Sequence, residues 1–370
     1  MDVLFVHLLN NYTGSPKVLA NFLEEYSKSS NEISLLTSKT DGCLSSISNV
    51  KYIDNKYRWF NNKILLTLVF IFSQIYQFFF VLCGKKYDCI YINTILPFGA
   101  AFAAKIRKEK VVYHVHEYYP KPHLMQRICV YFASKCADEY IFVSNYLKSC
   151  YKGIFLKKGI VIHNAVSNDL KTSAKDFITN NDYIKNKFIN KQIVLPCALK
   201  KYKGVNVFLE LSKQLPQYNF LLVTSNSKNE SDSYFKDKEV PKNFKILNQV
   251  KDMSKIYSEA SIVLNLSIPH GIDKIIETFS MILIEAFEFK TPCIAPCYGG
   301  PLEIIQEAEN GFLLEVENIS EVVNKIEYIM SDYNLYKGFS EKAYTRSKDF
   351  ATVKFVGSIE QIIMSEGKND

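Results

Sequence analysis

Residues 277–305 read ETFSMILIEAFEFKTPCIAPCYGGPLEII. The segment EAFEFKTPCIAP is typical of a helix followed by a buried strand, and the chain enters that helix at residues 277–280. A Gly-Gly pair follows the strand. A helix that leads directly into a buried strand indicates a parallel sheet with helices packed against it.

The same alternation runs along the whole chain. The strand-like runs of the first half are DVLFV, ISLLT, DCIYIN, KVVYHV, EYIFVS and GIVIHN, and those of the second half are QIVLPCA, YNFLLVT, FKIL, SIVLNL, PCIAP and GFLLEV. Segments with helical spacing separate them. The pattern predicts an α/β fold of two doubly wound, Rossmann-like parallel-sheet domains that face each other across a cleft.

The length of 370 residues also favours two domains. Residues 167–191 are polar and rich in Asn and Lys, which predicts a linker and the entry to the second domain. We expect an N-terminal domain over 1–170 and a second domain over 185–345. A C-terminal helix within 346–370 is expected to cross back to the first domain.

Charge is distributed unevenly. Residues 1–166 carry 20 Lys and Arg against 11 Asp and Glu, although the whole chain has a net charge of only +7. The basic residues are dispersed through apolar sequence, without a basic recognition helix or an RNA-binding signature. An anionic membrane surface is therefore the expected partner of the first half, and nucleic acid is not.

Nine cysteines are scattered along the chain without a CxxC pair, which fits neither a disulfide framework nor a zinc site. The N-terminal MDVLFVHLL has no basic leader and is typical of a first buried strand. Reduced thiols and a cytoplasmic location are the expectation.

The segment from Ile64 to Cys83 contains 20 residues without a charge. On a helical wheel its polar neighbours fall in one arc of about 120°; they are Lys63, Thr67, Ser73, Gln74 and Gln77. Three alternatives stay open: a core helix, a helix that lies in the membrane interface, and a membrane span. A span would break the strand alternation on both sides.

The opening stretch also suggests chemistry. A helix N-terminus offers free N–H groups and a partial positive charge, which suits a diphosphate near residues 278–282. Glu285 would accept hydrogen bonds from a ribose diol, and Glu277 would face the group beyond the phosphates. Gly299 and Gly300 would let a ligand approach the backbone closely.

These residues resemble a family. Glu277-x7-Glu285, TPCIAPCYGGPLEII and NGFLL are similar to the signature of the large retaining glycosyltransferase family of GT-B fold, glycosyltransferase family 4 type. Its members move a sugar from a nucleotide diphosphate to an acceptor. YTGSPKVL, VVYHVHE, YIFVSNYLK, VIHNAVS and KKYKGV are similar to further family motifs, so the resemblance extends over most of the chain.

The resemblance implies that the domain over 1–170 is the acceptor side and that the domain over 185–345 binds the donor. It also implies roles for particular residues. Glu277, His116 and Lys203 would be catalytic, with His116 contacting the donor sugar from the first domain. The implied donor-binding residues lie in the phosphate-binding loops and the helix start: Glu285, Lys203, Lys200, Lys201, Thr278, Phe279, Ser280, Met281, Ile282, Gly14 and Ser15. Each has an ordinary structural alternative, namely a solvated helix face for Glu285, a solvated loop for the lysines and a strand-end histidine for His116. His114 shares a strand face with His116, but no third ligand is evident and no metal site is expected.

Two positions depart from the family pattern. The family usually has an arginine where this chain has Cys197 and Ala198. Lys200 and Lys201 are the candidates to supply that charge, although a lysine lacks the bidentate geometry of an arginine. Ser280 stands where the family commonly has glycine, which is tolerable if the backbone there stays helical.

Together these features predict a metal-independent retaining glycosyltransferase without a cofactor, because no Asp-x-Asp motif is present. It would use a nucleotide diphosphate sugar and a glycan or polyprenyl-diphosphate-linked acceptor in lipopolysaccharide or capsule synthesis. The expected location is the cytoplasm, peripherally on the inner face of the cell membrane. The alternative is a non-catalytic GT-B-fold partner subunit of a membrane polysaccharide assembly complex.

Overall fold

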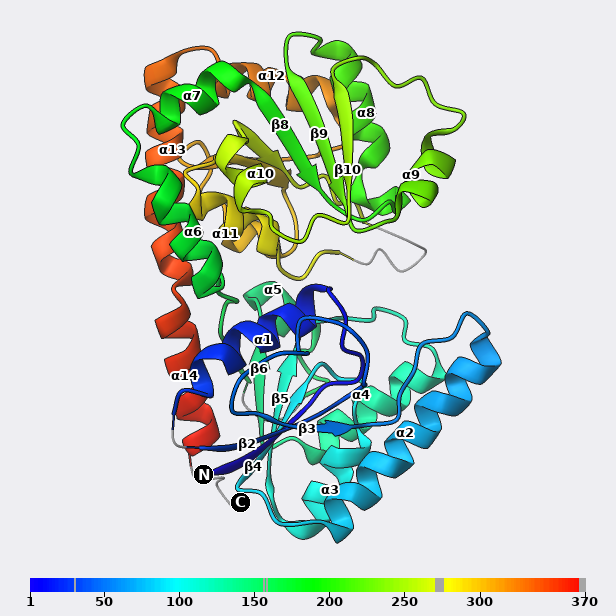
Figure 1. Cartoon of the computed structure of the whole chain (residues 1–370). Helices are drawn as coiled ribbons and strands as arrows, with labels where there is room; N and C mark the ends of the chain where they lie inside the picture. Colours follow the sequence, from blue (N-terminus) through cyan, green and yellow to red (C-terminus); the bar gives the residue numbers. More distant parts are fainter. Residues whose placement is uncertain (30, 156, 158, 270–275, 366–370) are drawn as a thin grey trace. The chain divides into compact units, whose positions relative to one another are not determined.

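The computed structural model describes residues 1–29, 31–155, 157, 159–269 and 276–365 (Figure 1). The chain divides into two compact units. The first contains Met1–Ala165 and the chain from Thr352 onward, and the second contains Val166–Ala351. The boundaries predicted at residues 170 and 345 therefore lie at Ala165 and Ala351.

The first unit contains a seven-stranded parallel sheet of order β3-β2-β1-β4-β5-β6-β7. Its strands are β1 (Asp2–Val6), β2 (Glu32–Thr37), β3 (Lys51–Asp54), β4 (Cys89–Asn93), β5 (Lys110–Val115), β6 (Glu139–Phe142) and β7 (Gly159–Val161). Its helices are α1 (Gly14–Tyr26), α2 (Lys63–Cys83), α3 (Gly99–Arg107), α4 (Leu124–Cys136), α5 (Asn145–Cys150) and α14 (Thr352–Met364).

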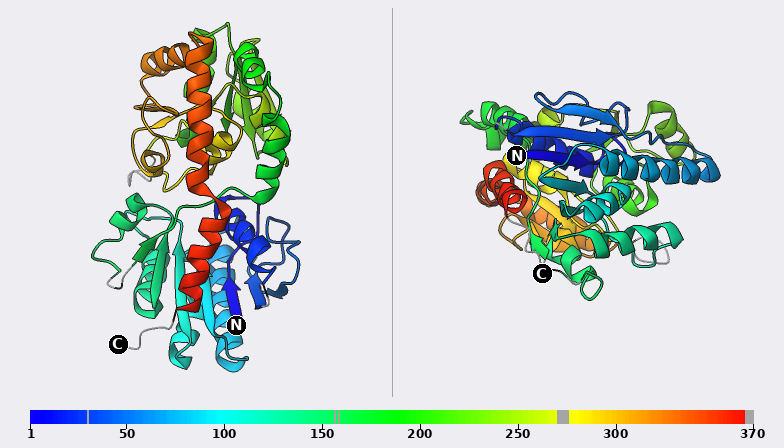
Figure 2. Two further views of the ribbon diagram at one scale, coloured as in Figure 1. Left: turned by 90° about the vertical axis from the view of Figure 1, so that its left-hand side faces the viewer. Right: turned by 90° about the horizontal axis from the view of Figure 1, so that it is seen from below.

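Aromatic side chains join α1 and α14 to this sheet. Phe22 of α1 stacks on Tyr91 of β4 with ring centroids 6.1 Å apart, and Phe355 of α14 meets Phe22 edge-on at 6.3 Å. Figure 2 shows α14 running along the sheet of the first unit. The chain from Thr352 to Met364 thus completes a core whose other parts come from the first 165 residues.

The second unit contains a six-stranded parallel sheet of order β10-β9-β8-β11-β12-β13. Its strands are β8 (Gln192–Pro196), β9 (Asn219–Thr224), β10 (Phe244–Asn248), β11 (Ile262–Leu264), β12 (Cys293–Pro296) and β13 (Gly311–Leu314). Its helices are α6 (Asn168–Ile178), α7 (Tyr183–Asn190), α8 (Val205–Gln214), α9 (Lys228–Phe235), α10 (Ser254–Glu259), α11 (Met281–Glu288), α12 (Ile319–Ile329) and α13 (Tyr333–Ser347). Three 3-10 turns are η1 (Lys201–Lys203), η2 (Gly300–Glu303) and η3 (Lys348–Phe350).

Both sheets are doubly wound, which confirms the predicted fold class. Strand order reverses between β1 and β4 in the first unit and between β8 and β11 in the second. Ligands of such sheets bind beyond the carboxyl ends of the strands at these reversal points. The loops that follow β1, β4, β8 and β11 are therefore the places to look for a site.

Residues 167–191, predicted as a linker and the entry to the second domain, do open the second unit, but they form helices and not a linker. These helices are α6 and α7, which begin after the cap Ser167 and after Asp182. Helix α6 buries Ala174, and α7 buries Tyr183, Ile184 and Lys187, so both helices pack against the rest of the second unit even though their composition is polar.

Helix α2 packs with its polar side inward. Ser73, Gln74 and Gln77 are buried, and Gln74 Oε1 accepts hydrogen bonds from the N–H groups of Phe98 and Gly99 at 2.8 and 3.0 Å. Gln74 thereby satisfies two of the free N–H groups at the N-terminus of α3. Of the three alternatives for this segment, the core helix is wrong, because its apolar face does not pack in the core.

The apolar side of α2 is exposed. One stripe at helical spacing contains Ile64, Leu65, Leu68, Ile71, Phe72, Ile75 and Phe79. By length and composition, α2 is the one helix among the described residues that could cross a membrane. Of its most apolar stretch of 18 residues, 28% is buried. Its packing against α3 instead places it on the surface of the first unit.

Candidate functional site

The loop after β8 brings Lys203 to the reversal point of the second sheet. Lys203 ends the turn η1, and Gly204 follows with φ +73°. A side chain at Gly204 would collide with the carbonyl of Leu266, so only glycine fits this close approach of the loops after β8 and β11. Lys203 is therefore held beside the chain that follows β11.

Lys203 pairs with Glu277. Its Nζ lies 2.9 Å from Glu277 Oε2, and the hydroxyl of Ser267 donates to the same oxygen at 2.6 Å. Burial alone would lower the pKa of Lys203, but the Glu277 carboxylate more than offsets it and leaves that pKa above its ordinary value. The result is a charged pair, about a quarter exposed at Lys203 and a fifth at Glu277.

Glu285 lies in the second turn of α11 and is only 3% exposed. Its Oε2 accepts a hydrogen bond from the Tyr257 hydroxyl at 2.9 Å. Burial, followed by the carboxylate of Glu285, raises the pKa of that hydroxyl well above its ordinary value. The Glu285 carboxylate is therefore a buried hydrogen-bond acceptor fixed by Tyr257, and it does not lie on a solvated helix face.

The start of α11 differs in detail from the expectation. The helix begins at Met281, so Met281 and Ile282 carry N-terminal amides, whereas Thr278 and Phe279 lie in the preceding loop. Ser280 is the N-cap with φ −125° and ψ 100°, which is extended and not helical. Because this φ is negative, serine is tolerated there, and its Oγ accepts from Asn265 Nδ2 at 2.9 Å.

The glycine pair serves the protein itself. Side chains at Gly299 or Gly300 would collide with the backbone of residues 277–279, and Gly300 N–H donates to the Glu277 carbonyl at 2.9 Å. These glycines therefore make room for the loop that carries Glu277, and their predicted approach to a ligand stays a prediction. The turn η2, which ends at Glu303, follows directly.

Lys200 and Lys201 remain apart from this cluster. Both are exposed. Lys200 Nζ lies 5.7 Å from the ring centroid of Tyr202, and Lys203 Nζ lies 5.8 Å from the same centroid. Among the sequence-predicted lysines, Lys203 is the one that the structure brings to Glu277.

Asn93 organises the reversal point of the first sheet. It is fully buried at the end of β4, and its Oδ1 accepts from His116 Nε2 at 2.9 Å. Its Nδ2 donates to the carbonyl of Ser15 at 3.1 Å and lies 3.0 Å from His7 Nδ1. The structure thus joins His116, directly after β5, to the first turn of α1, where Gly14 faces open space.

Burial controls the protonation of this region. It lowers the pKa of His7 to about 4, that of His114 to about 3 and that of His116 well below its ordinary value. The rings of His114 and His116 lie 4.1 Å apart, as the strand alternation predicts. Burial also raises the pKa of Glu117 to about 7. At neutral pH the three imidazoles are uncharged.

Several contact residues were missed from the sequence. Asn93, Ser267 and Tyr257 touch predicted site residues but belong to no quoted motif. A structural signal does mark one of them: Thr94, directly after Asn93, has φ +78°, a strained value for a β-branched residue.

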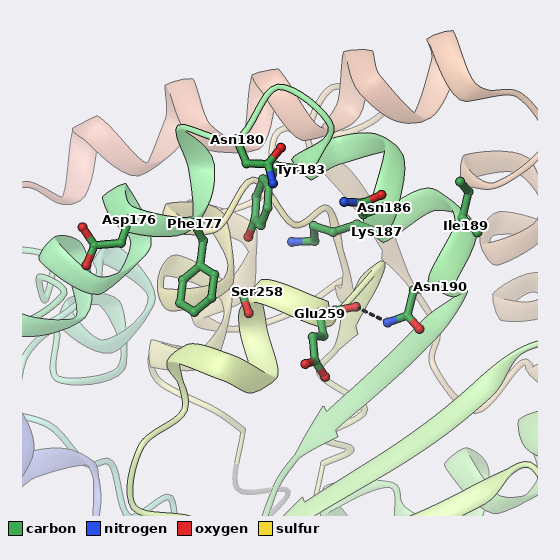
Figure 3. A pocket seen from close by; sticks show the side chains of 10 residues that line it. All are labelled: Asp176, Phe177, Asn180, Tyr183, Asn186, Lys187, Ile189, Asn190, Ser258 and Glu259. Carbon is green, nitrogen blue, oxygen red and sulfur yellow. Dashed lines mark hydrogen bonds between the residues drawn. The ribbon is translucent and has the colours of Figure 1, made fainter.

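A separate cavity of about 720 Å³ opens among α6, α7 and α10 (Figure 3). Lys187 lines it, is 1% exposed, and donates from Nζ to the carbonyls of Tyr257 and Phe289 at 3.1 and 2.6 Å. Burial holds the pKa of Lys187 well below its ordinary value. The cavity contains none of the predicted site residues, but Lys187 ties α10 to the end of α11 and so steadies the helix of Glu285.

The arrangement can bind an anion and a diol together. In the second unit, a cation, two carboxylates and the N-terminal amides of α11 gather at the carboxyl edge of the sheet. Among the described residues, no three His, Cys, Asp or Glu side chains are grouped to hold a metal ion. All nine cysteines are described, and each is a free thiol.

Two family models match the chain. "Glycosyltransferase Family 4" matches residues 12–170, and "Glycosyl transferases group 1" matches residues 180–346. An uncharacterized glycosyltransferase of Haemophilus influenzae is 28% identical over 176 residues, which cover 46% of this chain and 48% of that protein. One of Methanocaldococcus jannaschii is 24% identical over 231 residues, 62% of this chain and 60% of that protein. The chain thus spans about half the length of the first relative and three fifths of the second.

The fold has a close counterpart among solved structures. Anabaena HepE in complex with UDP-glucose superposes with a TM-score of 0.75 over 99% of this chain and 100% of that one, at 19% identity. This likeness shows a shared fold of two doubly wound domains.

Proposed function

Because the chain belongs to the glycosyltransferases of GT-B fold, whose two family models together match most of it, we propose that it is a retaining enzyme that moves a sugar from a nucleotide diphosphate to a glycan acceptor. The observation that carries the proposal is the ion pair of Lys203 and Glu277 beside the start of α11, with Glu285 one turn further on. Lys203 and the helix amides would bind the diphosphate, and Glu285 the ribose.

In the proposed reaction, the acceptor hydroxyl attacks the anomeric carbon from the face that the diphosphate leaves. The new C–O bond forms as the bond to the diphosphate oxygen breaks, and that oxygen takes the proton of the hydroxyl. No protein nucleophile is needed. Lys203 and the N-terminus of α11 would stabilise the charge on the leaving diphosphate, which is why we propose that no metal is required. Activity should then persist in excess EDTA.

Donor binding is the first test. HepE was solved with UDP and with UDP-glucose, so UDP-sugars are the first donors to try. Calorimetry should detect UDP binding, and one UDP-sugar of a panel should be hydrolysed slowly in the absence of acceptor. Lys203→Ala should weaken both UDP binding and the slow hydrolysis. The control is Lys228→Ala, which removes an exposed ion pair with Asp232.

A second candidate function is a non-catalytic partner subunit. It is favoured by Cys197 and Ala198 in place of an arginine, since Lys200 and Lys201 lie exposed and away from Glu277. A scaffold of this kind should bind no nucleotide sugar and hydrolyse none, so the donor screen decides between the two.

We further propose that the first unit binds the inner face of the cell membrane and takes a lipid-linked acceptor, of the kind used to build surface polysaccharides. Exposed Ile64, Phe72 and Phe79, at 74%, 58% and 54%, lie along one side of α2, while the polar side packs inward. Such inverted packing favours a bilayer over water as the neighbour of α2.

Charge supports a lipid partner over a second copy of the chain. Helices α2, α3 and α4 contain five cations and no Asp or Glu. Lys105 and Arg107 pair with Asp138 and Glu109, which leaves Lys63, Arg127 and Lys135 without an ion pair among the described residues. Two such faces would repel each other, whereas an anionic leaflet attracts each basic residue near it by roughly 1 kcal/mol.

Liposome flotation tests this surface. The protein should bind phosphatidylglycerol vesicles, and binding should fall with salt without vanishing, because only the ionic part is screened. A triple variant should lose the salt-resistant part of vesicle binding without unfolding, because the three residues are exposed. The variant carries Phe72→Ser, Ile75→Ser and Phe79→Ser. Ile189→Ser with Val353→Ser removes exposed apolar area elsewhere and is the matched control. Unchanged flotation of the triple variant, or dimerisation through α2 in solution, would refute lipid contact.

A further inference from the structure

We propose that a cavity in the first unit binds a non-reacting sugar residue of the acceptor glycan; this rests on the proposed glycosyltransferase function. The cavity measures about 470 Å³ and lies at the carboxyl ends of β2 and β3. We call it the β2–β3 cavity. Its lining includes Asn10, Thr37, Lys39, Thr40, Tyr52 and Asp54.

The wall of the β2–β3 cavity is built in advance. Asn10, 3% exposed, donates from Nδ2 to the Thr40 carbonyl at 2.8 Å and accepts at Oδ1 from Leu44 N–H at 2.9 Å. A side chain at Gly42 would collide with Asn10 and Asn11, so the loop after β2 lies directly against the loop after β1. This close packing fixes the loop before any ligand arrives.

One hydroxyl in the cavity lacks a partner. Thr37 lines the cavity and is 5% exposed, and its Oγ1 has no hydrogen-bond partner among the described residues. Buried polar atoms are nearly always paired, and an unpaired one is costly. A ligand hydroxyl would complete the bonding of Thr37, because hydroxyls both donate and accept.

The remaining lining suits a sugar ring. Tyr52 and Ile53 offer apolar surface, whereas Lys39 is exposed and forms no ion pair within the described part of the chain. Asp54 stays ionised, since the hydrogen bonds of Arg58 lower its pKa to about 2. A pyranose has hydroxyls at its edge and C–H groups on its faces, which match such a mixed surface.

The position of the cavity on the sheet fits a sugar residue of the acceptor that does not itself react. The strand order places β2 three strands from β5, which ends beside His116. Three strand spacings amount to about 14 Å, so a sugar in the cavity is not the one that attacks. Asp54 lies nine residues before Lys63, where α2 begins, so the cavity adjoins the chain that leads into the lipid-facing helix, where the lipid-proximal part of a glycan would lie.

A glycan array tests the proposal. The probe is a set of mono- to hexasaccharides attached through their reducing ends, read with labelled protein in the presence of UDP. The parent should bind one or more glycans of at least two residues. Thr37→Val and Lys39→Met should each lower that binding about tenfold, as expected for one lost hydrogen bond. Lys28→Met and Thr179→Val, at exposed positions elsewhere, should leave it unchanged.

UDP affinity separates this proposal from the proposed function. Calorimetric UDP binding should be the same in all five proteins, and its loss in the parent would refute the donor site and not the cavity. Thr37→Val should also raise the melting temperature without glycan, because it removes an unpaired hydroxyl. Equal glycan binding by parent, Thr37→Val and Lys39→Met overturns the proposal, and so does a parent that binds UDP but no glycan.

Discussion

Glu277 Oε2 receives two donors at once, the ammonium of Lys203 at 2.9 Å and the hydroxyl of Ser267 at 2.6 Å. The two donors come from loops after neighbouring strands, β8 and β11, at the point where the strand order reverses. The carboxylate therefore fixes the position of the cation that we assign to the diphosphate.

This relationship predicts different effects for the two glutamates. Glu285→Ala should raise the dissociation constant for UDP about tenfold or more, because it removes a buried acceptor for the ribose. Glu277→Ala should mainly lower kcat, by about a hundredfold, because Lys203 loses its anchor and its raised pKa. Calorimetry and steady-state kinetics separate the two. Near-native constants in both variants would refute the assignment, and Glu210→Ala on the solvent side of α8 is the control.

A second prediction concerns the missing arginine. Lys203→Ala should weaken donor binding strongly, and either Lys200→Ala or Lys201→Ala should weaken it too if one of them supplies the absent charge. The measurement is donor KM at several ionic strengths, since an exposed lysine should lose influence in salt. If both exposed lysines can be removed without a change in KM, the compensation idea is wrong and Lys203 acts alone.

A third prediction treats Asn93 as a positioning residue for His116. Asn93→Ala should lower kcat about tenfold to a hundredfold with little change in UDP affinity, because it frees both the imidazole and the Ser15 loop. Asn93→Asp keeps the acceptor for Nε2–H but adds a negative charge, which raises the pKa of His116. The acid limb of the pH–rate profile should therefore move to higher pH. Coincident profiles for Asn93→Asp and the parent would show that Asn93 does not act through His116.

Sequence reasoning found the strands wherever apolar residues dominate. DVLFV and SIVLNL are strands because burial on both faces leaves no alternative for such runs, whereas β3, with the sequence KYID and half-exposed, carries no such signal. Residues 168–190 look like a linker because their helices bury so little, one side chain in α6 and three in α7. A helical wheel correctly predicts that the polar residues of α2 share one side of the helix. It does not predict which side of the helix faces the protein.

The site was predictable only as far as motifs reach. Glu277, Glu285 and Lys203 lie in patterns that the family shares, and the structure brings Lys203 and Glu277 into contact. Asn93 and Ser267 act through contacts between loops far apart in sequence, so no local pattern marks them. The roles of all these residues stay predictions until the variants above are measured.

The last prediction concerns acid stability of the first unit. His7 and His114 have folded pKa values of about 4 and 3, whereas unfolded histidine has about 6.5. Their pKa values are depressed, so the unfolded chain binds more protons below pH 6.5 and stability is lost as the pH falls from 6.5 toward 4. Glu117 opposes this, because its folded pKa of about 7 gives stability that is present below pH 4.5 and is lost as the pH rises through 7. The pKa of His116 is lowered as well, so three histidines oppose one glutamate, and we expect the first unit to lose stability as the pH falls below 6.5.

His114→Asn isolates one of these protons. Asparagine can keep a hydrogen bond to the Tyr91 hydroxyl, which lies 2.7 Å from His114 Nδ1, and it removes the titrating ring. The free energy of unfolding should depend less steeply on pH in this variant, by about 1.4 kcal/mol per pH unit between pH 4.5 and 6. Urea unfolding at pH 4.5, 5.5, 6.5 and 7.5 measures the slope, and His123→Asn, at the exposed cap of α4, is the control. Parallel pH curves for His114→Asn and the parent would mean that His114 takes up its proton in the folded protein as it does in the unfolded chain.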